Sequence, residues 1–337
     1  MRNIYDLTIK ELEDYFISIN EKKFRAVQVY EALYKRRIKS FDDMTNISKE
    51  VREKLKQDFS FYKIKMLIKQ QGKNVNKYLF ELEDGNKIES VLMFHDYGTS
   101  ICVSSQVGCN MTCAFCESGR LKKVRNLLAY EIVQQILQIE EDINKRITHV
   151  VLMGIGEPFD NYDNVLRFVK IINCGKGIDI GSRHITISTC GVIPGIKKFM
   201  NEEGQVNLAI SLHAPNNTLR SRIMPINKAY PLNELMETIK EYINKTNRRV
   251  TFEYIMLDNV NDSEENAKEL AILLKGINCY VNLIPYNETE NIEFKRTKEW
   301  KIMKFYDILK KNKINVTIRK EFGGSVDAAC GQLRANN

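Results

Sequence analysis

The sequence contains no uninterrupted apolar stretch that approaches the ~18 residues needed to span a bilayer. The first residues, MRNIYDLTIKELEDYF, have the spacing of an amphipathic helix and lack the apolar stretch of a signal peptide. The chain also has no repeat at a fixed period and no low-complexity tract. These absences argue against a membrane protein, a secreted precursor and a repeat architecture. We expect a soluble, cytoplasmic protein without a membrane partner.

The cysteines of this sequence lack the even spacing found in secreted domains that are stabilised by disulfides. Three of the eight cysteines lie within eight residues of one another. In a chain of this length, such clustering indicates reduced thiols that serve as ligands or as redox groups.

The net charge of +8 is concentrated near the beginning of the chain. Residues 1–77 carry 18 Lys and Arg against 11 Asp and Glu, a surplus of seven that leaves the remainder nearly neutral. A basic appendage on a neutral body suggests a polyanionic partner, with RNA or DNA first. From charge alone, a basic surface that is merely solvated is an equal alternative.

Three regions of different character follow one another along the 337 residues. Residues 7–57 have apolar positions at helical spacing, and residues 78–93 read as a β section with a hairpin turn at Asp84-Gly85-Asn86. From about residue 96, strand-like apolar runs alternate with helical runs. We therefore expect a helical N-terminal domain at 1–60, a β linker section at 61–95 and an α/β domain at 96–337.

The alternation in the third region predicts a parallel sheet. Strands are expected at 101–106, 149–154, 184–190, 206–213, 250–257, 280–287 and 314–320, and helices at 128–143, 161–173, 192–201, 230–244, 262–275 and 298–311. Repeated strand-then-helix units imply right-handed crossovers. Their number suits a partial (β/α)6 barrel better than a full eight-fold one, and catalytic residues should lie at the carboxyl ends of the strands.

Cys109, Cys113 and Cys116 form a C-x-x-x-C-x-x-C motif just after the first of these strands. Three thiolates in one loop can hold three irons of a [4Fe–4S] cubane and leave the fourth iron open for a small chelating ligand. That iron could bind S-adenosylmethionine and deliver the electron that fragments it to a 5′-deoxyadenosyl radical. The alternative is a zinc site, which normally has four ligands in C-x-x-C pairs, and no fourth ligand lies nearby in the sequence.

This spacing, with the aromatic Phe115 before the last cysteine, resembles the radical S-adenosylmethionine superfamily. In that superfamily the strand after the cluster loop ends in a Gly-Glu motif that contacts the amino group of the cofactor, and VLMGIGEPFDN has this motif. Gly154 and Gly156 would let the backbone approach a ligand, and Glu157 would accept a hydrogen bond from an ammonium group.

The segments CVSSQVGC, RNL at 125–127, GIGEPFDN, SLHAPN, RSRIMPIN and DAACGQLR together resemble the RlmN/Cfr family of RNA methyltransferases along the whole chain. GIGEPFDNY, RSRIMPIN and CGQLRA look closer to the RlmN branch. The resemblance implies a radical S-adenosylmethionine enzyme with a [4Fe–4S] cluster that methylates adenine carbon 2 in large-subunit (23S) rRNA, with tRNA as a second substrate.

The resemblance also implies a ping-pong methyl transfer with three catalytic residues. One S-adenosylmethionine methylates the Cys330 thiolate, and the radical from a second removes hydrogen from that methyl group. The methylene radical adds to the adenine carbon, Cys102 attacks the sulfur of Cys330 to form a disulfide, and Glu89 accepts the ring proton. Radical chemistry agrees with the substrate, because the adenine C–H at carbon 2 is not acidic and that carbon is not nucleophilic.

Further contacts to S-adenosylmethionine follow from the motifs of the family. They are Gly156, Glu157, Ser188, Ser211, Leu212 through its backbone, His213 and Asn287. Cys174, Cys190 and Cys279 are interpreted as packing residues. Cys190 and Glu117 depart from the family pattern, in which smaller or less polar residues are usual at these positions near the cluster.

RNA is expected to dock on the N-terminal helices and beside the cluster loop. The basic residues in these places are Lys22, Lys23, Arg25, Lys35, Arg36, Arg37 and Lys39, and Arg120, Lys122, Lys123 and Arg125. The target adenine must leave its stack to reach Cys330, which favours accessible loop bases. We further expect a monomer that receives electrons from a donor such as flavodoxin or ferredoxin.

Three alternatives remain open at this point. A Cfr-like enzyme would methylate carbon 8 of adenine and confer antibiotic resistance, and no residue separates the two target carbons. A radical enzyme that acts on a small molecule or peptide would have no use for Cys102 and Cys330. A non-catalytic RNA-binding protein stabilised by zinc would never yield 5′-deoxyadenosine.

Overall fold

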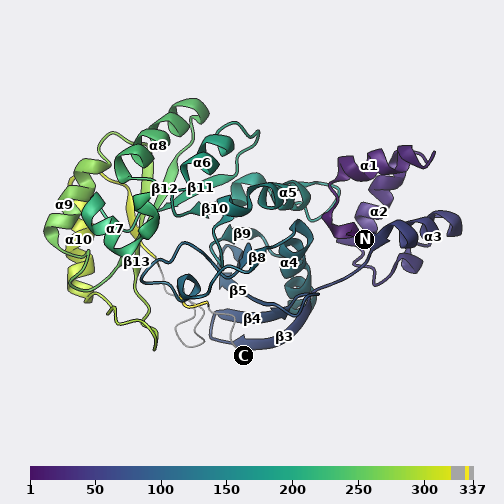
Figure 1. Cartoon of the computed structure of the whole chain (residues 1–337), viewed down its shortest axis with the longest axis horizontal. Coiled ribbons are helices and arrows are strands. Elements are labelled where there is room, and N and C mark those ends of the chain that lie inside the picture. The colour runs from purple at the N-terminus through teal and green to yellow at the C-terminus, as the bar shows by residue number, and fades with distance from the viewer. Residues whose placement is uncertain (320–330, 334–337) are drawn as a thin grey trace.

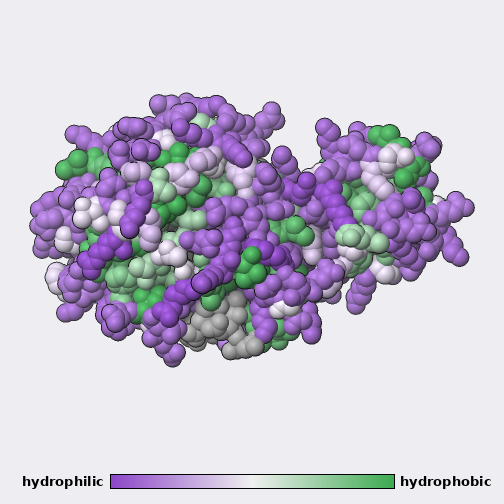
Figure 2. All heavy atoms as spheres, in the orientation of Figure 1, coloured by the Kyte–Doolittle hydropathy of each residue, from purple (hydrophilic) through white to green (hydrophobic). Residues whose placement is uncertain are grey.

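A computed structural model gives the fold, and it describes residues 1–319 and 331–333. Cys330 lies outside the described residues. A small helical unit lies beside a larger α/β body (Figure 1). In the space-filling view the helical unit forms a separate lobe, and the visible surface of both parts is largely hydrophilic (Figure 2). Among the described helices, none has both the length and the apolar character that crossing a membrane requires.

The N-terminal unit is helical, as the spacing of its apolar residues predicts. It contains α1 (Ile9–Ser18), α2 (Phe24–Tyr34) and α3 (Lys49–Asp58). A capping box begins α1, because the Thr8 hydroxyl accepts from the Glu11 backbone and the Glu11 carboxylate accepts from the Thr8 backbone. The parallel pair β1 (Arg2–Asn3) and β2 (Phe59–Ser60) joins the two ends of the unit.

The body is built on one sheet with the strand order β14-β13-β12-β11-β10-β9-β6-β5-β4-β3. Its parallel strands are β6 (Gly98–Cys102), β9 (His149–Leu152), β10 (Ile185–Thr189), β11 (Asn207–Ser211), β12 (Val250–Met256), β13 (Cys279–Pro285) and β14 (Val316–Ile318). The crossover helices are α4 (Ala129–Ile143), α5 (Tyr162–Asn173), α6 (Ile193–Phe199), α8 (Leu232–Thr246), α9 (Glu264–Leu273) and α10 (Glu299–Lys311). This alternation confirms the predicted partial barrel, with six crossovers in the described part of the chain.

A short helix between β11 and α8 was not predicted. It is α7 (Asn217–Ile223), which begins where the Asn216 side chain accepts from the Leu219 backbone. Its sequence, NTLRSRI, has too few apolar residues to show a helical period. The helix nevertheless contributes to the site described below.

The β section continues the barrel sheet. It contains β3 (Lys65–Gln71), β4 (Val75–Glu81) and β5 (Lys87–His95), all antiparallel, and β5 pairs with β6. The predicted hairpin turn is present, with Gly85 in the left-handed region at a φ of 82°. The division of the chain at residues 60 and 95 stays a prediction, although the sheet itself crosses the second boundary without a break.

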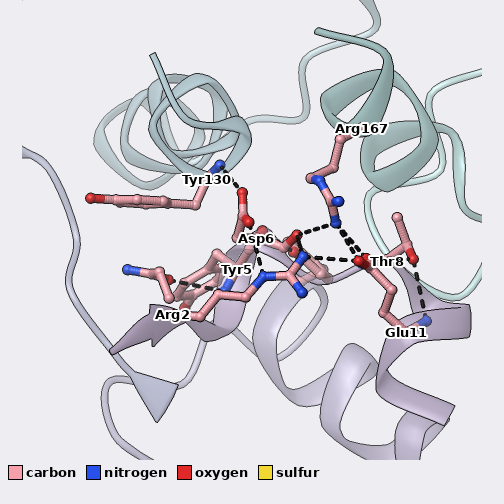
Figure 3. Close-up of polar contacts among 9 residues, drawn as sticks. Arg2, Tyr5, Asp6, Thr8, Glu11, Tyr130 and Arg167 are labelled. Atoms are coloured by element: carbon pink, nitrogen blue, oxygen red, sulfur yellow. Dashed lines mark hydrogen bonds and ion pairs between the residues drawn. The ribbon is translucent and has the colours of Figure 1, made fainter. Parts of the chain in front are cut away.

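The N-terminal unit is fixed to the body by a shared core and by a charged junction. One continuous cluster of buried apolar residues runs from Ile4 to Val316 and includes side chains of both parts. At its edge, Arg167 of α5 donates to Glu11 of α1 at 2.5 and 2.6 Å, and Arg2 donates to the same carboxylate at 3.0 Å (Figure 3). The Tyr130 backbone of α4 donates to Asp6 at 3.3 Å.

Candidate functional site

A pocket of about 830 Å³ opens at the carboxyl ends of the parallel strands, where a barrel is expected to bind its ligand. The residues around it that the sequence analysis singled out are Cys109, Cys113, Phe115, Cys116, Gly154, Gly156, Glu157, Ser188, Cys190, Ser211 and His213. The structure therefore brings the three motif cysteines and most of the expected cofactor contacts together in one cavity.

The cluster loop, residues 108–116, is held by backbone hydrogen bonds. The Cys109 N–H donates to Leu121 O at 3.0 Å, and the Cys116 N–H donates to Cys113 O at 3.1 Å. The Ala114 N–H donates to Ile223 O at 2.9 Å, which ties the loop to α7. Because the backbone is fixed in this way, the three cysteines line the pocket from a preformed loop.

The three thiols lie close enough to influence one another. Burial, with a contribution from the neighbouring Cys116, raises the pKa of Cys109 to about 12. Burial also raises the pKa of Cys113 well above its ordinary value, and both other cysteines add to the effect. Within the described residues no three ligand groups converge on the single point that one ion needs. Three thiolates carried on one loop suit a [4Fe–4S] cubane by their chemistry, because each thiolate would then bind its own iron corner.

The chain just after Cys330 is hydrogen-bonded to the segment that follows the cluster loop. Gly331 lines the pocket, and its carbonyl accepts from the Glu117 N–H at 2.8 Å. The Leu333 carbonyl accepts from the Ser118 hydroxyl at 2.7 Å. Cys330 itself is not described, but the residue bonded to it in the chain lies at the wall of the pocket.

Cys102 is not among the residues that line the pocket. It ends β6 and is 8% exposed. Its side chain belongs to a small apolar cluster that also contains Val91, Ile155 and Leu333. A residue three positions after Cys330 in the sequence therefore packs in the same cluster as Cys102.

Glu157 is fixed by its own chain before any ligand is considered. Its two carboxylate oxygens accept from the Phe159 N–H at 3.0 Å and the Cys190 N–H at 2.8 Å. Burial raises its pKa, and these backbone hydrogen bonds act in the opposite direction. The carboxylate therefore has a set orientation at the pocket, with lone pairs remaining for a further donor.

The two glycines of GIGEP were expected to let the backbone approach a ligand. In the structure they leave room for a neighbouring segment of the chain. A Cβ atom on Gly154 would lie 2.7 Å from Val103 O, and one on Gly156 would lie 2.7 Å from the Gln106 side chain. Gly156 also has a φ of 111°, which disfavours any other residue. Both glycines are required by the neighbouring chain at 103–106, and both also border the pocket near Glu157.

His213 is a buried, neutral imidazole. Burial and the positive charge of Arg220 lower its pKa to about 3. The Ile255 N–H donates to Nδ1 at 3.0 Å, so the ring proton is on Nε2. The Phe115 ring packs edge-on against it, with 4.8 Å between ring centroids. The φ of His213 is 58°, which is unusual for a non-glycine residue and agrees with a functional position.

The remaining expected contacts differ in how closely they approach the cavity. Ser188 and Ser211 line it from the ends of β10 and β11. Leu212 is fully buried behind it, and its carbonyl accepts from Arg220 at 3.2 Å. Asn287, two residues beyond β13, is half-buried and is not among the residues that line the pocket.

Glu89 lies on β5, on the same face as Cys102. Val91 pairs directly with Cys102, and residues two apart on a strand share a face. The Glu89 carboxylate is 3% exposed and lies 3.2 Å from the Lys77 ammonium group. The Ser104 hydroxyl joins the Glu89 backbone to the strand-end glycine motif, because it donates to Glu89 O and accepts from the Ile155 N–H.

Sequence reasoning missed Glu253 and Arg319, which also line the pocket. Glu253 Oε1 accepts from Asn282 at 2.8 Å, whereas Oε2 is buried, accepts no hydrogen bond from the described residues and lies 3.8 Å from Arg319. Burial raises the pKa of Glu253. The signal was an acidic residue inside the apolar strand VTFEYIML, where a core strand has no reason to place one.

Cys190 was interpreted as a packing residue, and the structure gives it a second role. Besides lining the pocket, its backbone N–H is bonded to Glu157 and its carbonyl accepts from Arg220 at 2.6 Å. Cys279 is buried at the start of β13, and Cys174 follows α5, both away from the pocket.

The basic residues expected to dock RNA differ in exposure and in ion pairing. Arg37 is paired with Glu140, and Arg125 is paired with both Asp84 and Glu131, so these two support the fold. The exposed basic residues on the N-terminal unit and beside the cluster loop are Lys22, Lys23, Lys35, Arg36, Lys39, Arg120 and Lys122, whereas Arg25 and Lys123 are half-buried. Two of the exposed ones, Lys23 and Lys35, also form ion pairs with Glu13 and Glu31.

Two family models match this chain. Residues 2–60 match the ribosomal RNA large subunit methyltransferase N-terminal domain, and residues 103–271 match the radical SAM superfamily. The boundary of the first match lies close to the predicted limit of the helical unit.

Relatives match over nearly the whole chain. A probable dual-specificity RNA methyltransferase RlmN of Spiroplasma citri is 54% identical over 100% of this chain and 98% of its own length. A protein of the same name from Streptococcus thermophilus (strain CNRZ 1066) is 55% identical over 99% of this chain and 88% of its own. The crystal structure of a radical SAM methyltransferase from Sphaerobacter thermophilus is 41% identical, covers 100% of both chains and has a TM-score of 0.94.

Proposed function

The chain belongs to the RlmN family of radical S-adenosylmethionine RNA methyltransferases, and on that premise we propose that it methylates carbon 2 of an adenine in 23S rRNA and in tRNA through a methyl group carried on Cys330. The observation that carries the proposal is the position of Gly331, which follows Cys330 and lines the same pocket as the three motif cysteines. The description of relatives as dual-specificity enzymes supports more than one RNA substrate.

The pocket takes two cofactors in this proposal. Cys109, Cys113 and Cys116 hold the [4Fe–4S] cluster, which supplies the electron that cleaves S-adenosylmethionine. The fixed Glu157 carboxylate accepts from the ammonium group of S-adenosylmethionine beside Gly156. Ser188, Ser211 and the Nε2–H of His213 are further polar contacts at strand ends, and Leu212 and Asn287 are the expected contacts with the least support from the geometry.

Methyl transfer passes through the two remote cysteines. The Cys330 thiolate takes a methyl group from one S-adenosylmethionine and loses a hydrogen atom from it to the radical formed from a second. After the methylene group is attached to adenine and the ring proton has left, Cys102 attacks the Cys330 sulfur, so that the carbon–sulfur bond breaks and a disulfide forms. The freed carbon takes a proton to become the methyl group, and the unpaired electron left on the two sulfurs would return to the iron–sulfur centre. The shared apolar cluster of Cys102 and Leu333 supports this partnership.

Glu89 takes the proton that leaves the adenine ring. Its carboxylate is buried beside Lys77 on the face of the sheet that holds Cys102. Burial shields this base from water, which suits the removal of a proton from a carbon of the ring.

RNA docks on the exposed basic side chains of the N-terminal unit, with Lys22, Lys23 and Arg36 foremost, and on Lys122 beside the cluster loop. The junction at Glu11 and Arg167 fixes that unit relative to the pocket, so the docked RNA would present its adenine at a constant distance. We also propose a monomer, reduced by flavodoxin or ferredoxin.

A trapped intermediate tests this proposal. In Cys102→Ala the adenine–methylene–Cys330 bond cannot be resolved, so denaturing gels after anaerobic turnover should show a covalent RNA–protein adduct. Cys174→Ala is the matched control and should give free methylated RNA. Normal methylation by Cys102→Ala, without an adduct, would reject the proposed role.

The remaining alternative concerns the target carbon. Mass spectrometry of nucleosides from the modified RNA separates 2-methyladenosine from 8-methyladenosine. We expect only the first, and 8-methyladenosine alone would assign the chain to Cfr-like chemistry.

A further inference from the structure

Arg220 is a fully buried cation whose hydrogen-bond partners are all uncharged. Its Nε donates to Leu212 O at 3.2 Å, and its Nη1 donates to Asn227 Oδ1 at 2.9 Å. Its Nη2 donates to Cys190 O at 2.6 Å and to Ser211 O at 3.3 Å. Among the side chains that the structure describes, Arg220 forms no ion pair.

A buried guanidinium without an opposite charge is costly, because hydrogen bonds to neutral groups replace only part of its hydration. The half-buried Arg125 shows the usual solution, with carboxylates of Asp84 and Glu131 within 2.8 Å. Glu157 is linked to Arg220 only indirectly, through residue 190, since its carboxylate accepts from the Cys190 N–H. Arg220 therefore lacks a direct counter-ion in the described chain.

The position of Arg220 indicates where that counter-ion would be. It lies on α7, and the last residue of α7, Ile223, accepts the Ala114 N–H of the cluster loop at 2.9 Å. Its Nη2 donates to the carbonyl oxygens of Cys190 and Ser211, and both of these residues line the pocket. Arg220 is thus directly behind the wall of the pocket at the cluster loop.

We propose that Arg220 is a positioning residue that supplies a fixed counter-charge to the iron–sulfur cluster. The inference rests on the proposed function, because it needs a [4Fe–4S] centre on Cys109, Cys113 and Cys116. Such a centre with three thiolates is a net anion, and it gains one more negative charge when an external one-electron donor reduces it. A nearby cation stabilises the reduced form more than the oxidised form and so raises the reduction potential.

This assignment explains the motif RSRIMPIN, which the catalytic account left without a role. Arg220 begins the motif and Asn227 ends it, and the two are hydrogen-bonded at 2.9 Å. Between them, Ile223 anchors the cluster loop and Met224 lines the pocket. The motif thus places a positive charge, a hydrogen bond to the cluster loop and a pocket-lining side chain next to one another.

The test is the reduction potential of the reconstituted cluster in the full-length protein, measured by EPR-monitored titration. Arg220→Gln should bind iron but have a potential shifted to more negative values. Arg222→Gln is the matched control, because Arg222 is an exposed arginine on the same helix and its loss should leave the potential unchanged. An unshifted potential in Arg220→Gln with full iron content would overturn the proposal.

Arg220→Lys separates charge from shape and also serves if the glutamine variant fails to fold. Lysine keeps the positive charge but cannot reach all four oxygen atoms, so its potential should stay close to that of the unaltered protein. A large negative shift in this variant, with full iron content, would assign Arg220 a purely structural role. If the unaltered protein forms no [4Fe–4S] cluster, the proposed function fails and not this inference alone.

Discussion

Charged side chains are paired differently in two regions of the molecule, namely the junction between the two lobes and the pocket at the strand ends. At the junction, Arg167 and Arg2 share the Glu11 carboxylate, so each charge has its partner within the chain (Figure 3). At the pocket, within the described residues, Arg220 is bonded only to neutral groups, and one Glu253 oxygen accepts no hydrogen bond and has only the Arg319 guanidinium 3.8 Å away. The junction is electrostatically complete, whereas the pocket has the incomplete pairing expected of a site that binds charged ligands.

If this contrast is right, pocket variants should lose chemistry and keep stability. The largest effect is expected for Cys330→Ala, which removes the group that carries the methyl. Methyl transfer should fall by at least about 1,000-fold, as for loss of a covalent nucleophile, while the cluster and the melting temperature are retained. Cys279→Ala is a control in a cysteine away from the pocket. Substantial methylation by Cys330→Ala would break the account.

Glu89→Gln should have the next largest effect. Glutamine keeps the size of the side chain but cannot accept the ring proton, so turnover should fall by about 100- to 10,000-fold. Release of 5′-deoxyadenosine in the first turnover should persist, because the step that fails comes later. Glu83→Gln, an exposed neighbour, serves as the control. Equal loss of radical formation and of methylation would point to a structural role instead.

Glu253→Gln should weaken S-adenosylmethionine binding with a smaller effect. An acceptor that is ionised and buried contributes about 1.5–3 kcal/mol when it gains a hydrogen bond, which corresponds to roughly 10- to 100-fold in affinity. Anaerobic titration of the reconstituted protein measures this directly. Unchanged affinity would mean that this Glu253 oxygen interacts only with Arg319 and does not contact the cofactor.

Glu11→Gln at the junction should reverse the pattern and reduce stability with no effect on the chemistry of the pocket. The loss should be about 1 kcal/mol or less, since the ion pairs are partly exposed and screened. Chemical denaturation measures this loss of stability. A Glu11→Gln variant with unaltered stability but no methylation would contradict the proposed difference between the two regions.

The same carboxylate gives the junction a pH dependence. Burial acts to raise the pKa of Glu11, but hydrogen bonds from Arg167, Thr8 and Arg2 outweigh it and lower the pKa to about 2. Because the folded pKa is depressed, this stabilisation is present above the unfolded value near 4.5 and is lost as pH falls toward 2. The glutamine variant should lack this part of the acid-induced loss.

The sequence predicted the pocket better than it predicted the charges behind it. Residues in motifs, such as Cys113 and Glu157, were placed together correctly because strand ends of a parallel sheet meet at one edge. Glu253 and Arg220 were missed because their importance depends on burial and on unpaired atoms, which no periodicity encodes. Helix α7 was missed because a helix of seven residues is too short to show an apolar face.

The basic residues also show what the sequence could not predict. Composition alone could not separate Arg37 and Arg125, which form ion pairs within the chain, from exposed residues such as Lys22. Ion pairing depends on which elements the fold brings together, so long-range charge partners were beyond prediction. The β section illustrates this too, because only the pairing of β5 with β6 revealed a single continuous sheet.

The most direct measurement of the central claim follows deuterium from S-adenosylmethionine with a trideuterated methyl group into the products. Transfer through Cys330 requires that one deuterium atom move to 5′-deoxyadenosine, so the methyl group on adenine carbon 2 should retain two. A product that retains all three, with unlabelled 5′-deoxyadenosine, would contradict the account.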